Sequence, residues 1–110
     1  MKDRVYLILL ALADSNLHGL GIARAVLELS DGRTHLWPAA LYGTLDELTE
    51  SGLIEELDEL RGRPADESGK KRFYRLTRPG HRALEAETDR LAVLVKTAKS
   101  RLKPRAGGAS

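Results

Sequence analysis

Apolar residues recur at helical spacing in four stretches of the chain, and two shorter apolar stretches lie between the third and the fourth. The spacing predicts helices over about residues 3–14, 17–30, 38–51 and 79–102, and strands over about 53–57 and 71–76. Pro38 and Pro79 fit the first turn of a helix, where a missing N–H costs nothing. Gly52 fits the left-handed position after a helix end. The fold class expected from this order is mainly α with a small β-hairpin.

The second predicted helix, over about residues 17–30, has Ser15 and Asn16 as candidates for its N-cap. Gly19 and Gly21 in its first turns weaken it by roughly 1 kcal/mol each relative to Ala. Close packing against another helix is the expected reason for both glycines. The apolar face of this helix is expected to carry Ile22, Val26 and Leu29.

The third predicted helix has an apolar face and, opposite it, a face of small or hydroxylated residues. The apolar face carries Leu41, Leu45 and Leu48. The opposite face is expected to carry Ala39, Ala40, Tyr42, Gly43 and Thr44. A helix with such a face can approach another backbone closely. A strand, a Gly- and Pro-bounded loop over 62–69 and a second strand follow, which is the order of a winged helix-turn-helix, a module that commonly binds duplex DNA.

Two aromatic residues lie near the start of that helix. Trp37 is expected to be a packing anchor rather than a base-stacking residue. Tyr42 lies just off the apolar face, so its hydroxyl is expected to point outward, where it can bond a phosphate. The alternative is that the Tyr42 ring covers the edge of the core.

The formal net charge is only +2, yet the charges are arranged in blocks. Residues 61–75 carry six basic side chains against two acidic ones, whereas residues 46–60 carry seven carboxylates and no base. Because the basic block flanks the predicted wing, it is expected to contact phosphates rather than form a merely solvated surface. The expected contacts are Arg63, Lys70, Lys71 and Arg72. With the last three from two subunits, log K against log salt would have a slope of about −5.

The last predicted helix carries a heptad-like seam spaced 4, 3, 4, 3, 4. Its members are Leu84, Thr88, Leu91, Val95, Ala98 and Leu102. We favour pairing of this seam with a second copy of the chain; the alternative is that it folds back on the first helix. The expected organisation is a winged helix-turn-helix over 1–78, a dimerisation helix over 79–103 and a disordered tail over 104–110.

Other chemistry has little support in the sequence. The chain has no Cys, and His18, His35 and His81 share no metal-ligand spacing, so no metal and no cofactor is expected. Neither a Gly-rich phosphate loop nor a nucleophile elbow is present, which makes an enzyme the weakest hypothesis. The apolar run over 5–13 is far shorter than the roughly 20 residues that span a bilayer, and no signal peptide is expected. A cytoplasmic location fits these features.

Several short segments, in order and at the right spacing, resemble the PadR family of bacterial transcriptional regulators. They lie at 17–23, 41–42, 50–54 and 71–80, within a resemblance that covers about residues 7–102. The chain departs from the family where Pro-Gly-Thr-Leu-Tyr-Pro is common, because it has Pro38-Ala39-Ala40-Leu41-Tyr42-Gly43. It also has Asp46 and Glu47 where the family often carries Arg.

The resemblance and the residues together predict a homodimer that binds double-stranded DNA and represses transcription. Two-fold symmetry predicts a roughly palindromic operator with half-sites about 34 Å apart. One alternative is a protein-interaction module that docks a basic partner on the acidic block without binding DNA. Another is a dimer that senses a small-molecule effector of unknown chemistry. The last helix has no aromatic residue, so no aromatic-stacking effector pocket is expected there.

Overall fold

The computed structural model describes residues 1–57 and 72–104. In chain order, these residues form α1 (Asp3–Ala11), β1 (Leu17–His18), α2 (Gly19–Leu29), α3 (Pro38–Glu50), β2 (Ile54–Glu56), β3 (Phe73–Leu76) and α4 (Arg78–Leu102). The mainly α fold class is confirmed. The predicted wing over 62–69 and most of the predicted tail lie outside the described residues.

Within the described residues, the sheet has three antiparallel strands in the order β1-β3-β2, which is one strand more than the predicted hairpin. In β1, Leu17 lies opposite Tyr74, and His18 lies opposite Phe73. The prediction that α2 begins at residue 17 with a cap at Ser15 or Asn16 is therefore wrong. His18 is the cap, and its Nδ1 accepts a hydrogen bond of 3.2 Å from the Gly21 N–H.

The core lies where α1, α2 and α3 meet the sheet and the start of α4. It contains Ile8, Leu9, Leu12, Ile22, Val26, Leu36, Leu41, Leu45, Leu48, Ile54, Tyr74 and Leu84. Leu29, which was expected on the buried face of α2, is 48% exposed because the helix ends there. The apolar pattern therefore located the core correctly, with one error at a helix end.

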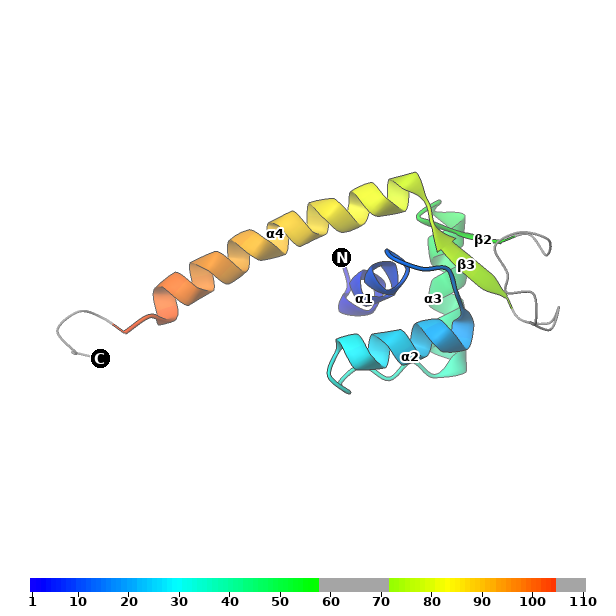
Figure 1. The fold of residues 1–110 in the computed structure, drawn as a ribbon, viewed down its shortest axis with the longest axis horizontal. Coiled ribbons are helices and arrows are strands. Elements are labelled where there is room, and N and C mark those ends of the chain that lie inside the picture. The colour runs from blue at the N-terminus through cyan, green and yellow to red at the C-terminus, as the bar shows by residue number, and fades with distance from the viewer. Residues whose placement is uncertain (58–71, 105–110) are drawn as a thin grey trace.

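The first half of α4 packs on α1, and its second half extends past the other helices (Figure 1). Leu84 is buried in the core, and the Tyr6 hydroxyl lies 2.8 Å from the Thr88 hydroxyl. These two seam residues contact their own chain, so the alternative of folding back on the first helix holds for them. The predicted division after residue 78 falls at the first residue of α4, whose early turns contribute Leu84 to the core.

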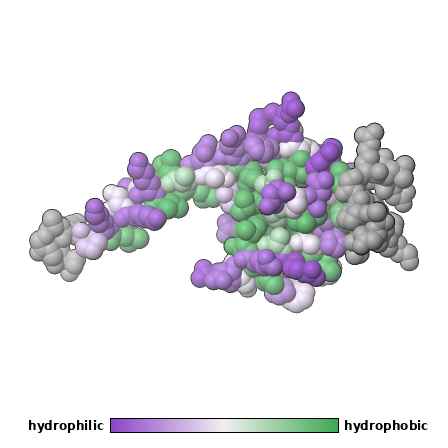
Figure 2. Space-filling model, in the orientation of Figure 1, coloured by the Kyte–Doolittle hydropathy of each residue, from purple (hydrophilic) through white to green (hydrophobic). Residues whose placement is uncertain are grey.

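Beyond Leu91, the residues of the seam are exposed rather than buried. Val95 is 52% exposed and Leu102 is 82% exposed. Apolar surface continues along α4 after it leaves the body (Figure 2). Within the described ranges, no helix combines the length and the apolar character needed to cross a membrane.

Candidate nucleic-acid interface

The exposed face of α3 is small and open. Leu41, Leu45 and Leu48 are buried, whereas Ala39, Ala40 and Gly43 are exposed. A β-carbon placed on Gly43 would meet no atom within 4 Å. The N-cap residue of α3 offers no side-chain hydrogen bond, which leaves the amides of its first turn for solvent or a ligand oxygen.

Thr44 does not belong to this exposed face, which corrects its expected role as a DNA contact. Its side chain is 3% exposed, and its hydroxyl donates a 2.8 Å hydrogen bond to the Ala40 carbonyl one turn earlier. A threonine within a helix can satisfy its hydroxyl in this way and so tolerate burial. The hydroxyl is therefore already bonded inside the helix.

Tyr42 is half-buried, which is intermediate between the outward-pointing hydroxyl and the core-covering ring that the sequence left open. The hydroxyl end of its ring lies against Gly19, where an added β-carbon would collide with it. This contact confirms the expected close helix packing at Gly19. At Gly21, an added β-carbon would instead approach the His18 ring that caps α2. The Tyr42 hydroxyl thus lies beside the N-terminus of α2, where helix amides favour an anion.

Arg72 joins α3 to the sheet. Its Nε and Nη2 donate to Glu56 Oε1 at 3.2 and 3.0 Å, and Nη2 also donates to Asp46 Oδ1 at 3.3 Å. The guanidinium carbon lies 5.7 Å from the centre of the Tyr42 ring and 5.5 Å from that of Tyr74. We call this group, formed by Arg72, Asp46 and Glu56, the Arg72 bridge. The hydrogen bond to Glu56 is the main cause that raises the pKa of Arg72.

The Arg72 bridge changes the expected role of Arg72. One guanidinium faces two carboxylates, so the bridge carries a formal charge of about −1 and Arg72 is not a free cation for a phosphate. The other three expected phosphate contacts, Arg63, Lys70 and Lys71, lie outside the described residues. The sequence contained a signal for the bridge, because an acidic block and a basic block on antiparallel strands must come side by side.

Trp37 is not the packing anchor that the sequence suggested. Its ring is 67% exposed and stacks on His35 with 4.8 Å between ring centres, while Leu36 occupies the core. The ring forms one end of an apolar groove of about 450 Å³ between α2 and α3, which Leu20 and Leu27 also line. This groove borders the first turn of α3.

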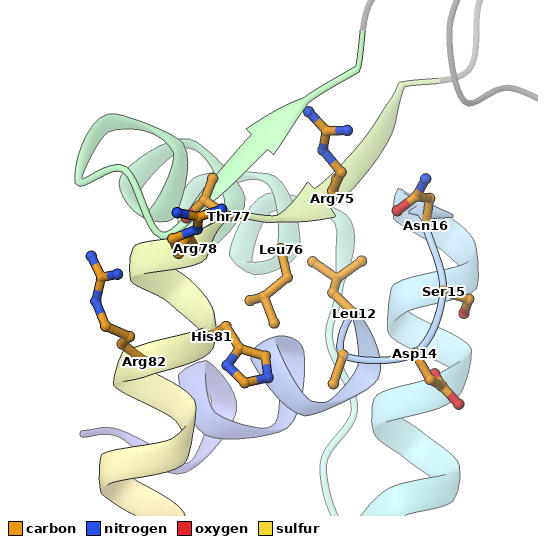
Figure 3. A pocket seen from close by; sticks show the side chains of 11 residues that line it. Leu12, Asp14, Ser15, Asn16, Arg75, Leu76, Thr77, Arg78, His81 and Arg82 are labelled. Carbon is orange, nitrogen blue, oxygen red and sulfur yellow. The ribbon is translucent and has the colours of Figure 1, made fainter.

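A second cavity, of about 660 Å³, lies between the end of α1, β3 and the start of α4. In Figure 3, Leu12, Leu76 and His81 lie near its centre, whereas Arg78 and Arg82 lie at one rim. No residue of α3 lines it. The cavity is therefore separate from the exposed face of α3. Among the described residues, no three His, Cys, Asp or Glu side chains come together as a metal site would need.

The sequence model of the transcriptional regulator PadR-like family matches residues 8–86. This chain belongs to the PadR-like family. The family is one of transcriptional regulators, and such a family is not generally one of enzymes. The match spans the end of α1, the helix-turn-helix formed by α2 and α3, the sheet and the first turns of α4.

Solved structures of low sequence identity share the PadR-like fold. A PadR family transcription regulator from hypervirulent Clostridium difficile R20291 has a TM-score of 0.72 and 20% identity, over 93% of this chain and 100% of that one. A transcriptional regulator from Clostridium thermocellum has a TM-score of 0.70 and 18% identity, over 91% and 90%. A PadR family regulator from Eggerthella lenta has a TM-score of 0.64 and 21% identity, over 94% and 87%.

One relative is more similar in sequence. An uncharacterized 37.1 kDa protein in transposon Tn4556 of Streptomyces fradiae is 38% identical over 93 residues. These residues are 84% of this chain and 24% of that protein. The chain therefore spans about a quarter of the length of this relative, which extends well beyond the PadR-like unit.

Proposed function

We propose that this PadR-like protein is a homodimeric, sequence-specific repressor that binds double-stranded DNA with α3 in the major groove. The observation that carries the proposal is the exposed face of α3, where Ala39, Ala40 and Gly43 leave the helix backbone open to a close partner. A recognition helix usually presents its first turns to base edges. Side chains this short bring the helix close to the floor of the groove.

Several protein groups around the exposed face of α3 are assigned to the DNA phosphates that flank the bound groove. The uncapped amides at the start of α3 and the Tyr42 hydroxyl beside α2 are both suited to an anion. Arg63, Lys70 and Lys71 supply cations from the predicted wing. These contacts set the position of the protein on the duplex, and base contacts from α3 set the sequence.

Dimerisation is assigned to the second half of α4. Its exposed seam residues are Val95, Ala98 and Leu102, with the half-buried Leu91 at their start. Two copies joined there would present two α3 helices to one face of the duplex, which requires a roughly palindromic operator. Repression is the proposed outcome because a dimer seated on an operator excludes other proteins from it.

The remaining assignments follow from this function. A protein that acts on the chromosome of a bacterium works in the cytoplasm, and we propose no catalytic activity for it. A small-molecule effector that alters the spacing of the two α3 helices is compatible with a dimer of this kind.

Selection of genomic fragments by the purified protein tests the proposal. We expect enrichment of fragments that share a palindrome with half-sites about 34 Å apart or a multiple of that spacing. Lys70→Glu combined with Lys71→Glu reverses four charges per dimer at the predicted wing and should abolish the enrichment. Recovery of no common sequence by the unaltered protein would contradict the proposal.

A protein-interaction module is the second candidate, and the carboxylates on the later turns of α3 favour it. Asp46, Glu47 and Glu50 are all exposed. A basic partner docked there would be insensitive to the change at Lys70 and Lys71, whereas DNA binding would collapse. Pull-down and DNA-binding assays of the same double variant therefore separate the two functions.

A further inference from the structure

We propose that Asp46 selects cytosine at one position of each operator half-site and that Arg72 holds the Asp46 carboxylate in place for this contact. The inference rests on the proposed function, because it requires α3 in the major groove. Arg72 then acts as a positioning residue on the protein side of the interface rather than as a phosphate contact.

Asp46 lies on the same exposed face of α3 as the residues assigned to the groove, about two turns after Ala39. Ala39, Gly43 and Asp46 follow one another at spacings of four and three, so they form one stripe on the exposed face of α3. The Asp46 side chain is 64% exposed. The two residues before it on the stripe carry at most a methyl group, so the helix can come close enough for a short aspartate to reach a base edge. Asp46 is the first side chain of the stripe that can form a hydrogen bond.

The carboxylate has a hydrogen-bond partner within the protein that orients it in the absence of DNA. Arg72 Nη2 bonds Asp46 Oδ1 at 3.3 Å, and the same guanidinium is held by two bonds to Glu56 and by the Tyr42 and Tyr74 rings. Each of these partners lies on α3, β2 or β3, the elements that frame the interface. A side chain with its orientation already set loses less conformational entropy when it binds.

The charge around Asp46 determines from which base its carboxylate can accept a hydrogen bond. With a formal charge of about −1, the Arg72 bridge repels phosphates and the acceptor atoms of base edges. Guanine presents N7 and O6 as acceptors in the major groove, and thymine presents O4. Adenine offers its N6 amino group beside the N7 acceptor, whereas cytosine offers its N4 amino group alone. A carboxylate is therefore matched best by cytosine.

The test compares the sequences that variants select from a random duplex pool. Asp46→Asn keeps the size of the side chain and replaces the carboxylate with an amide, which pairs with N6 and N7 of adenine. We expect the selected base at one position per half-site to change from cytosine to adenine. The relative affinity for the two matching duplexes should change by about tenfold or more, which is about 1.4 kcal/mol and within the range by which a good base contact discriminates.

Two further variants separate base selection from a general effect of charge. Glu50→Gln also removes one carboxylate from α3, and it should raise affinity for every duplex alike without changing any selected base. Arg72→Ala should weaken the cytosine preference to within about threefold while the other positions keep theirs, and Arg72→Lys should restore the preference only in part, because lysine lacks the planar fork.

The outcomes are distinguishable. If the unaltered protein selects no common sequence, both this inference and the proposed function fail. If it selects a palindrome but Asp46→Asn changes affinity without changing any base, the inference fails and the proposed function stands. If Arg72→Ala leaves the cytosine preference intact, Arg72 does not position Asp46.

Discussion

Tyr74 lies in the core with its ring inaccessible to solvent and the Arg72 guanidinium over it. Its hydroxyl is buried and finds no hydrogen-bond partner within the described part of the chain. Burial raises the pKa of Tyr74 to about 12, and the Arg72 charge opposes part of that rise. Ionisation of this one hydroxyl group therefore makes the free energy of unfolding change with pH in the alkaline range.

The direction of this dependence follows from the two states. Tyrosine in the unfolded chain ionises near pH 10, whereas Tyr74 in the folded protein stays neutral to about pH 12. Its contribution to stability is therefore complete below about pH 10 and is lost as the pH rises to about 12. Tyr74→Phe should flatten the free energy of unfolding across this window, as measured by denaturant titration followed by circular dichroism.

The same variant has an expected effect at neutral pH. Because Phe keeps the ring below Arg72 and removes a buried hydroxyl without a described partner, it should unfold with equal or higher free energy, by up to about 1 kcal/mol. A loss of more than 1 kcal/mol at pH 7 would contradict the view that the hydroxyl is unsatisfied.

Thr44 and Trp37 are two residues whose side-chain orientation could not be predicted from the sequence. The apolar spacing of α3 identified its buried face, but a threonine beside that face can turn its methyl inward and bond its own helix. The sequence predicts Trp37 as a packing anchor, whereas Leu36 beside it fills the core. Side-chain orientation at such borderline positions depends on neighbours that only the tertiary structure supplies.

Among the elements, the contact between α2 and α3 sets the position of the recognition helix. An alanine at Gly19 would force its β-carbon into the Tyr42 hydroxyl, whereas Gly43 on α3 faces open space. Gly19→Ala should therefore destabilise the fold by about 1–3 kcal/mol. Gly43→Ala should stabilise it by about 0.5–1 kcal/mol, because alanine is the better helix former.

Thermal unfolding of the two glycine variants measures both effects. The opposite signs are the informative part, since each variant adds the same methyl group to a helix. Equal effects of the two substitutions would mean that Gly19 does not govern helix packing.

Helices and strands with strong local patterns were predictable, and β1 was not. The start at Pro38 and the end at Gly52, with its φ of 80°, bounded α3 correctly. Pro79 marked the first turn of α4, which the structure caps with Thr77, whose hydroxyl accepts from the Gly80 N–H at 3.0 Å. Two residues form β1 only by pairing with β3, more than fifty positions later, so no local pattern could reveal them.

At the scale of the whole molecule, the second half of α4 determines whether two winged helices act together. Val95→Glu places a charge in the exposed seam and should yield a monomer in sedimentation velocity. Its affinity for the operator should fall by about a hundredfold, because binding of the second half-site is no longer intramolecular. Val93 is 64% exposed but lies off the seam, so Val93→Glu is the matched control.

If Val93→Glu dissociates the dimer as completely as Val95→Glu, the seam is not the interface. The sequence pattern alone could not divide the seam correctly, because heptad spacing does not distinguish a contact within the chain from one between chains. Leu84 and Thr88 satisfy the pattern, yet Leu84 is buried in the core of its own chain and the Thr88 hydroxyl bonds Tyr6 of α1.

In the proposed complex, a dimer binds duplex DNA through α3 and the cations that flank it. A titration of the selected palindromic duplex at several salt concentrations, followed by fluorescence anisotropy, tests this directly. We expect two protomers per duplex and a slope of log K against log salt of about −5 from Arg63, Lys70 and Lys71 of both subunits, with Arg72 retained in its bridge. Binding that ignores salt, or no binding in dilute buffer, would contradict the account.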